Sequence, residues 1–264
     1  VQATTWGHPI TSGLPTIDYF LTSALMEEAD AQAHYSERLV RMPGLSVHYH
    51  RPPTPDPWPL SRWGLPEDRT VYLCPQSLFK FHPAFDQGFA DILRNDATGL
   101  LVLVNAKIDH WGILLMDRLR RAAPDVADRI VLLPKQPYDA FLRLMQAAPV
   151  MLDTWPGGGN TTLEALAMGT PVVTLPDSHL RGRLSLGFYR AMGYEDLVAT
   201  SPDDFVARAL RLGGDPDARA HAREKIAARA GCLYEDRQTL DDVSLFLEEA
   251  TAGIPVSGTV ESGS

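Results

Sequence analysis

Cysteine, long apolar runs and basic charge are all scarce in this sequence. Cys74 and Cys232 are the only cysteines among its 264 residues, too few for a disulfide framework or a cysteine-based metal site. No apolar run approaches the roughly 20 residues that a membrane span requires, and no signal-peptide pattern follows Val1. These absences predict a protein of a reducing, cytoplasmic compartment with no membrane partner.

Acidic residues outnumber basic ones, 33 to 24, and the formal net charge is -9. A general nucleic-acid-binding surface is therefore not expected. An anionic ligand would have to be held by local positive groups and not by the overall field. No aspartate pair or His/Asp cluster has the pattern of a metal site, so we expect neither a metal nor another cofactor.

The first 60 residues are predicted to form the end of one α/β unit followed by a linker. A short strand is expected over Ile17–Leu21, a helical rhythm over Met26–Tyr35, and a short helix turning into a loop over Tyr35–Pro43. Residues 51–59 contain five prolines and cannot form a regular helix, so they are interpreted as a segment that crosses between two lobes.

From Arg69 onward, apolar strands alternate with helical patterns, which predicts an α/β fold with a doubly wound parallel sheet. The expected strands are Val71–Cys74, Leu100–Val104, Ile130–Leu133, Pro149–Leu152 and Pro171–Leu175. The expected helices are Pro83–Arg94, Gly112–Ala122, Asp139–Ala147, Thr161–Met168, Arg183–Met192, Pro202–Leu212, Ala218–Ala230 and Leu240–Ala250. The second lobe is predicted to span residues 61–250, and residues 251–264 to form a flexible tail.

A glycine turn organises the second lobe. Gly157, Gly158 and Gly159 follow a buried strand and precede a helix, so a phosphate could approach the backbone. The free amides and dipole of a helix N-terminus favour an anion. Thr161 and Thr162 would add hydroxyl donors. A plain strand-turn-helix with a threonine cap is the alternative interpretation.

Three loops are expected beyond the carboxyl ends of the strands, where such sheets bind ligands. They are Pro75–Lys80, Pro134–Tyr138 and Asp153–Thr162. Lys80 is either a solvated surface lysine or the cation that faces a bound anion. Glu164 is either a solvent-facing first-turn acid that complements the helix dipole or an acceptor for ribose hydroxyls.

The string from Asp153 to Thr174 resembles the nucleotide-binding half of GT-B glycosyltransferases, and more closely the O-linked N-acetylglucosamine transferase family with its bacterial, tetratricopeptide-repeat-associated relatives. Residues 6–13, 35–43 and 74–80 carry the same resemblance. The resemblance covers most of the chain. It implies a GT-B fold in which residues 1–60 are the remnant of the acceptor-side lobe and residues 61–250 bind the UDP-sugar.

The resemblance also implies roles for individual residues. Gln76 and Lys80 match a glutamine and a lysine that bind the donor diphosphate. The paired threonines at the helix start match Thr161 and Thr162. The remaining donor-binding positions implied by the resemblance are Gly159, Asn160, Glu164 (ribose), Gln136 and Tyr138 (the uracil loop), and Gly7 and Pro9 (the sugar).

Several of these positions keep alternatives. The Tyr138 ring either stacks on the base or covers the core. His8 is a candidate general base near neutral pH, or a packing or sugar-contacting residue. Arg181, Arg183 and His179 either steer an acceptor and close the cleft or form structural ion pairs.

The predicted function is transfer of a sugar, with N-acetylglucosamine favoured, from a UDP-sugar to a protein Ser or Thr hydroxyl, with inversion and without metal. Lys80 would stabilise the leaving UDP. The chain opens in the middle of a pattern, so we expect a fragment whose parent carries tetratricopeptide repeats and the catalytic base upstream of Val1. The alternatives are a non-catalytic UDP-sugar-binding module and, less well matched, a GT-B-like epimerase.

Overall fold

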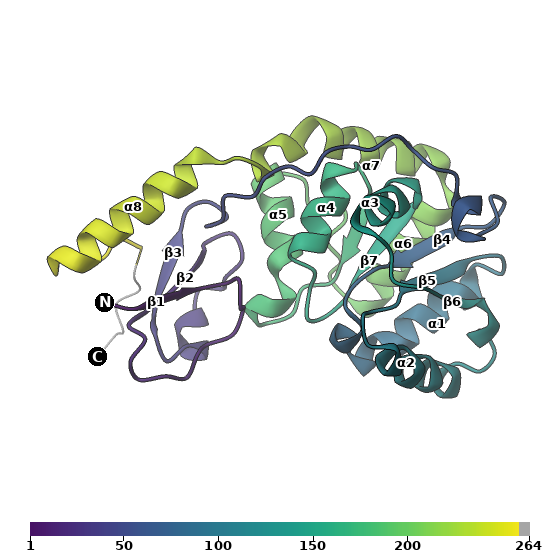
Figure 1. Cartoon of the computed structure of the whole chain (residues 1–264), viewed down its shortest axis with the longest axis horizontal. Helices are drawn as coiled ribbons and strands as arrows, with labels where there is room; N and C mark the ends of the chain where they lie inside the picture. Colours follow the sequence, from purple (N-terminus) through teal and green to yellow (C-terminus); the bar gives the residue numbers. More distant parts are fainter. Residues whose placement is uncertain (259–264) are drawn as a thin grey trace.

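The computed structural model describes residues 1–258, whose strands form two parallel sheets (Figure 1). The first lobe carries a three-stranded sheet in the order β1-β2-β3, made by β1 (Ala3–Thr5), β2 (Tyr19–Ser23) and β3 (Arg38–Met42). The second lobe carries a five-stranded sheet in the order β6-β5-β4-β7-β8, made by β4 (Val71–Cys74), β5 (Leu100–Val104), β6 (Ile130–Leu133), β7 (Val150–Asp153) and β8 (Val172–Thr174). The predicted parallel α/β fold is confirmed.

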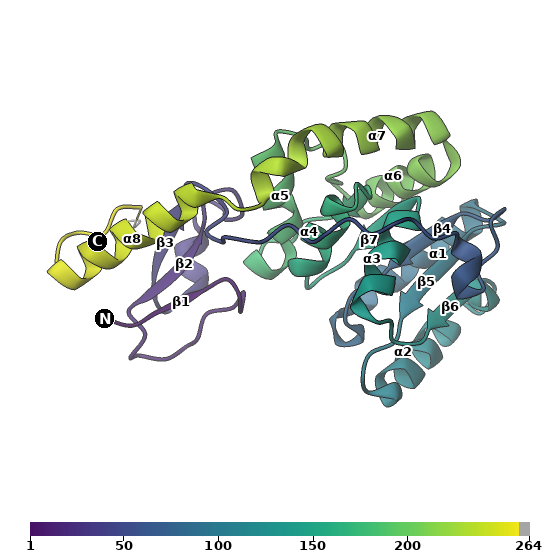
Figure 2. The ribbon, with the colours of Figure 1, turned by 45° about the horizontal axis from the view of Figure 1, so that its top comes forward.

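Helices cover both faces of the larger sheet. The helices of this lobe are α1 (Asp86–Asn95), α2 (Asp109–Ala122), α3 (Tyr138–Ala147), α4 (Asn160–Ala167), α5 (Leu184–Met192), α6 (Pro202–Gly214) and α7 (Pro216–Arg229), and a last helix, α8 (Arg237–Ala252), follows them in the chain. The strand order first runs from β4 to β6 and then turns back to β7 and β8. Right-handed crossovers therefore place α1 and α2 on one face and α3 and α4 on the other. Consistently, α1 contacts α2 and α6, whereas α3 contacts α4 (Figure 2).

Short 3-10 helices connect these elements. They are η1 (Ala31–His34), η2 (Leu60–Trp63), η3 (Leu78–Lys80), η4 (Pro83–Phe85), η5 (Ala127–Arg129), η6 (Leu180–Gly182) and η7 (Ala230–Leu233).

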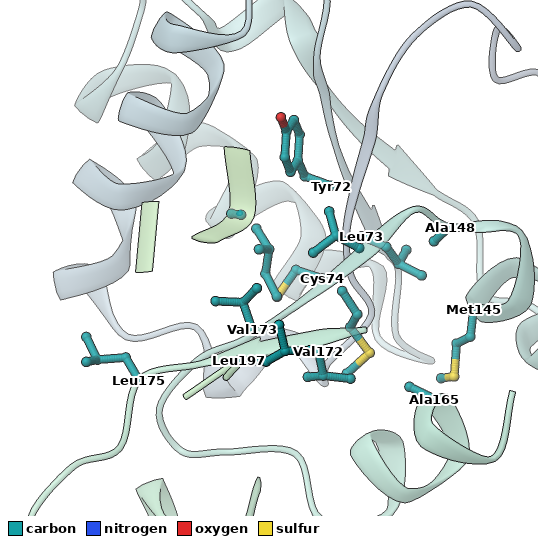
Figure 3. Close-up of a cluster of buried hydrophobic side chains, with 14 of the residues drawn as sticks. Tyr72, Leu73, Cys74, Met145, Ala148, Ala165, Val172, Val173, Leu175 and Leu197 are labelled. Carbon is teal, nitrogen blue, oxygen red and sulfur yellow. The ribbon is translucent and has the colours of Figure 1, made fainter. Parts of the chain in front are cut away.

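The central strands are buried on both sides, as expected for a parallel sheet between two layers of helices. Every residue of β4, β5 and β7 is buried. Figure 3 shows part of this core, where Cys74 of β4 lies near Val173 of β8, and Met145 of α3 lies near Ala165 of α4. Cys74 of β4 is fully buried, so it is a core residue.

The first lobe departs from the sequence prediction in two places. β3 forms where a short helix turning into a loop was expected over Tyr35–Pro43, because parallel pairing with β2 is a long-range contact that local spacing does not show. Residues 26–35 contain turns and only the short η1, so the predicted helical rhythm is wrong. The Glu27 carboxylate there is buried and accepts hydrogen bonds from Thr22 and Tyr35, which holds the segment in an irregular path.

The last helix packs on the first lobe and not on the larger sheet. Figure 1 shows α8 beside β3, and Phe246 and Ala250 of α8 form a small apolar cluster with Leu21, Val40 and Met42. Val256 is buried in the same cluster, so the part of the predicted flexible tail up to residue 258 is structured, and residues 259–264 lie outside the described residues. The predicted domain boundaries at residues 60 and 250 stay predictions. The boundary at residue 250 placed most of α8 in the second lobe, whereas α8 packs on the first lobe.

Two segments connect the lobes, and they lie side by side. Residues 51–59 form no regular element, as predicted. Where this segment leaves the first lobe, Glu235 N donates to Tyr49 O at 2.9 Å and Arg51 N donates to Glu235 Oε1 at 2.9 Å. Glu235 belongs to the returning segment between η7 and α8. The outgoing and returning crossings are therefore joined by hydrogen bonds.

Candidate functional site: a cleft at the carboxyl edge of the larger sheet

The strand order reverses between β4 and β7, which makes the space beyond these two strands the expected ligand site of a doubly wound sheet. The loop that follows β4 contains Gln76 and Lys80, and the loop that follows β7 contains the glycine turn. A hydrogen bond of 2.5 Å from Gln76 Nε2 to Asp153 Oδ1 joins the two loops directly. The structure thus brings together residues 77 positions apart that the sequence prediction placed in one site.

Lys80 lies at the glycine turn. Its Nζ donates a hydrogen bond of 3.2 Å to Gly157 O. Burial lowers the pKa of the Lys80 ammonium, and the nearby charge of Asp153 acts in the opposite direction. The side chain is therefore partly buried at the predicted anion site and is not a solvated surface lysine.

The glycine turn offers fewer free amides than the sequence suggested. Gly157 N donates to Arg181 O at 2.5 Å, and Gly158 N donates to Asp153 Oδ1 at 2.8 Å. Leu163 N makes the first bond along α4, to Gly159 O. The amides at the start of α4, residues 160–162, precede this bond, so they are the donors left to face an anion at the positive end of the helix.

The two threonines of α4 differ in exposure. Thr161 is half-buried at the helix start, and Asn160 is exposed beside it. Thr162 is fully buried, and its hydroxyl lies 3.0 Å from the Ser185 hydroxyl of α5. The Thr162 hydroxyl lies against Ser185 in the protein interior, and its contact with the diphosphate stays a prediction.

Glu164 is not the solvent-facing acid of the alternative interpretation. Only 9% of it is exposed, and burial raises the pKa of its carboxyl, while a hydrogen bond from Tyr138 lowers it. Burial together with the charge of Glu164 and this hydrogen bond raises the pKa of Tyr138 to about 12. The pair joins the start of α3 to α4 and places a carboxylate and a hydroxyl at one wall of the site.

A cleft of about 470 Å³ opens between the loops that follow β4, β5 and β6. Gln76, Gln136 and Tyr138 line it, as predicted from the three loops. Gln136 Oε1 accepts a hydrogen bond of 3.1 Å from Trp63 Nε1, which orients its amide. Sequence reasoning missed Asn105 and Phe141, which also line the cleft. Asn105 directly follows β5 at the same edge, so its position carried a usable signal. For Phe141, in the second turn of α3, the sequence carried none.

The loop of Gly7, His8 and Pro9 lies beside the glycine turn through its neighbour Trp6. A Cβ atom placed on Gly159 would lie 3.5 Å from the Trp6 ring. Trp6 is buried, and its Nε1 donates to Leu45 O at 2.9 Å. His8 itself is exposed and does not join the buried part of the site.

Arg183 joins the two lobes. Its Nε donates to Met26 O at 2.5 Å, and Nη1 lies 2.8 Å from Glu28 Oε1. The structural ion-pair interpretation therefore describes Arg183. His179 stacks on His34 of the first lobe with ring centroids 4.8 Å apart. Arg181 contributes its carbonyl oxygen to the glycine turn.

Comparison with known proteins gives consistent matches. The family model described as Glycosyl transferase family 41 matches residues 59–242. A probable UDP-N-acetylglucosamine--peptide N-acetylglucosaminyltransferase SPINDLY of Petunia hybrida is 30% identical over 233 residues, which cover 84% of this chain and 24% of that protein. The UDP-N-acetylglucosamine--peptide N-acetylglucosaminyltransferase of Caenorhabditis elegans is 28% identical, with 81% of this chain and 20% of that protein covered.

Among solved structures, a mutant of the Thermobaculum terrenum O-GlcNAc transferase superposes with a TM-score of 0.80 at 27% identity, covering 92% of this chain and 47% of that one. A sucrose-phosphate synthase from Thermosynechococcus elongatus superposes with a TM-score of 0.56 at 17% identity, over 89% of this chain and 59% of that one, and shares the fold. The chain spans about a quarter of the length of the curated relatives and about half of the first structure.

Proposed function

Because the chain belongs to glycosyl transferase family 41, we propose that it binds a UDP-sugar in the cleft of the second lobe and takes part in transferring the sugar to a protein. N-Acetylglucosamine is the proposed sugar and a Ser or Thr hydroxyl the proposed acceptor, as the names of the similar proteins suggest. One observation carries the proposal: the Lys80 ammonium is hydrogen-bonded to Gly157 O of the glycine turn, three residues before α4 begins.

The chemistry that this arrangement supports is a displacement at the anomeric carbon. The acceptor oxygen forms a bond to that carbon, the bond to UDP breaks, and the hydroxyl proton passes to a base. Negative charge grows on the diphosphate as it leaves. A fixed ammonium and helix amides stabilise that charge more strongly in the transition state than in the bound donor.

Inversion at the anomeric carbon and independence from metal are further parts of the proposal. Within residues 1–258, no group of three or more His, Cys, Asp or Glu side chains is arranged to hold a metal ion. His8 is the candidate base within this chain, and its exposure leaves room for an acceptor to approach. Association with tetratricopeptide repeats and a cytoplasmic location, both implied by the resemblance to this family, are further parts of the proposal.

No helix of residues 1–258 is both long and apolar enough to cross a membrane.

The proposal is tested by two measurements. Calorimetric titration of the chain with UDP should show binding, whereas CDP should bind more weakly because the base edge differs. The chain joined to its upstream sequence should then release UDP from UDP-N-acetylglucosamine in step with sugar incorporation into a protein acceptor. UDP binding without transfer to any acceptor would favour the non-catalytic module, and absence of UDP binding would reject the donor site.

A further inference from the structure

Asp153 is the most heavily hydrogen-bonded buried acid of the second lobe. It ends β7 and is only 2% exposed. Its Oδ1 accepts from Gln76 Nε2 at 2.5 Å and from Gly158 N at 2.8 Å, and its Oδ2 accepts from Thr174 Oγ1 at 2.9 Å. The Ser185 hydroxyl is a fourth hydrogen-bonding partner. These donors come from the loop after β4, the glycine turn, β8 and α5.

The partners of Asp153 lead to the diphosphate side of the proposed donor site. Gln76 lines the cleft, and Gly158 is the middle residue of the glycine turn. Ser185 connects Asp153 to Thr162 in the first turn of α4, where the Thr162 hydroxyl lies 3.0 Å from the Ser185 hydroxyl. Because Ser185 has one hydroxyl hydrogen and an ionised carboxylate can only accept, Ser185 donates to Asp153 and Thr162 donates to Ser185.

The charge of Asp153 also acts on the cation of the site. Burial lowers the pKa of Lys80, and Asp153 is the charged group that raises it. Burial raises the pKa of Asp153 itself, while its hydrogen bonds and Lys80 act in the opposite direction. The other titratable groups that face Asp153 are Cys74 of β4 and Tyr189 of α5. Burial raises the pKa values of both, Asp153 adds to the rise for Cys74, and Tyr194 and then Asp153 add to it for Tyr189.

We propose that Asp153 is a positioning residue of the donor site: its carboxylate holds Gln76, the glycine turn and the first turn of α4 in one arrangement, and balances the charge of Lys80 until a diphosphate arrives. The inference rests on the function proposed above. Burying a carboxylate is costly unless its hydrogen bonds and a counter-charge offset that cost. The partners of Asp153 are the groups that would surround the diphosphate, so the buried carboxylate holds them in place before the diphosphate binds.

The test separates the diphosphate from the nucleoside. Asp153→Asn keeps the shape of the side chain and removes its charge. We expect it to weaken UDP binding by about tenfold or more, the scale of a charge-assisted hydrogen bond. Uridine, which has no phosphate, should bind within about twofold of the unmodified chain. Calorimetry for UDP and NMR titration for uridine give the two dissociation constants.

The pH dependence gives a second readout. Without the Asp153 charge, Lys80 loses its proton at lower pH, so the decline of UDP affinity on the alkaline side should begin at lower pH in Asp153→Asn than in the unmodified chain. A loss of folding alone would weaken UDP and uridine binding together and would leave the pH dependence of UDP affinity unchanged.

Asp96→Asn is the matched control. Asp96 also accepts several hydrogen bonds, from Tyr72 Oη at 3.0 Å and Gly99 N at 2.9 Å among others, but it precedes β5 at the opposite edge of the sheet. It should lower the melting temperature and leave both affinities unchanged. If Asp153→Asn does not fold, Thr174→Val, which removes one donor to Asp153, should show a smaller loss for UDP alone.

Equal losses of UDP and uridine affinity, or unchanged UDP affinity with an unchanged pH profile, would overturn the positioning role while the donor site stands. Failure of the unmodified chain to bind UDP would overturn the proposed function and this inference with it.

Discussion

The buried carboxylates of the two lobes are surrounded in different ways. In the first lobe, Glu37 is 1% exposed and accepts 2.7 Å hydrogen bonds from Thr11 Oγ1 and Ser12 N. Burial by itself would raise the pKa of Glu37, but the hydrogen bonds from Ser12 and Thr11 outweigh it and bring the pKa to about 2. In the second lobe, burial wins, and the pKa values of Asp153 and Glu164 are raised.

The difference separates Glu37, which completes a structure, from Glu164, which has one hydrogen-bonding partner and is available to a ligand. The partners of Glu37 lie in the loop at residues 11–12 and beside it, so its hydrogen bonds fasten one loop of the first lobe. Glu164 has Tyr138 as its hydrogen-bonding partner, and Tyr138 lines the cleft. A buried acid with few donors gains more from ribose hydroxyls than one that is already saturated. A variant of Glu37 should therefore lose stability, whereas a variant of Glu164 should lose ligand affinity.

The largest effect is expected for Lys80→Ala. Its ammonium is the cation that lies on the glycine turn, and removing it should reduce turnover of UDP-N-acetylglucosamine by about 10²-fold or more. The melting temperature should change little, because the side chain makes one hydrogen bond to a backbone oxygen. Lys225→Ala on α7 is the control, a partly buried lysine remote from the cleft. Turnover unchanged in Lys80→Ala would remove the lysine from the mechanism.

Glu164→Ala should weaken UDP binding by about 1.5–3 kcal/mol, the range for a hydrogen bond to a charged group. The sharper measurement compares UDP with its 2′-deoxy and 3′-deoxy analogues by calorimetry. If Glu164 binds a ribose hydroxyl, one deoxy analogue should already be weaker in the unmodified chain, and the variant should bind that analogue and UDP equally. A loss that is the same for all three ligands would contradict the ribose contact.

Glu37→Gln should act on stability and not on binding. Loss of the charged acceptor should lower the free energy of unfolding by about 1.5–3 kcal/mol in a urea titration, with UDP affinity unchanged. The pKa of Glu37 is depressed in the folded chain, so its stabilisation is fully present above about pH 4.5 and is lost as the pH falls toward about 2. Weakened UDP binding in Glu37→Gln would contradict the conclusion that Glu37 stabilises the first lobe without acting on the ligand.

The second lobe was largely predictable because its signals are local. Apolar runs such as Leu100–Val104 and the glycine turn before Asn160 appear in the sequence with their boundaries nearly correct. The clustering of Gln76, Lys80 and the turn followed from one rule, that parallel strands present their carboxyl ends at the same edge. The proposed roles of Gly159, Asn160 and Thr161 at the helix start stay predictions.

The first lobe and the finer structure of the site were not predictable, because they depend on distant contacts. β3 exists through pairing with β2, and the irregular path after Met26 follows from burial against α5. Nothing near Thr162 in the sequence shows that its hydroxyl lies against Ser185. The partners of Asp153 lie 77, 5, 21 and 32 positions away, so the sequence marks Asp153 as the start of the glycine loop but does not show the three distant partners.

The paired crossings beside Tyr49 and Glu235 constrain how the lobes can move. A single connecting segment would let the two lobes twist freely, whereas the two adjacent crossing segments act as a narrow hinge (Figure 1). Any swing of the lobes about this hinge would change the distance between the His8 loop and the mouth of the cleft. Since the ion pair of Arg183 and the stacked rings of His34 and His179 also bridge the lobes, opening has to part both contacts.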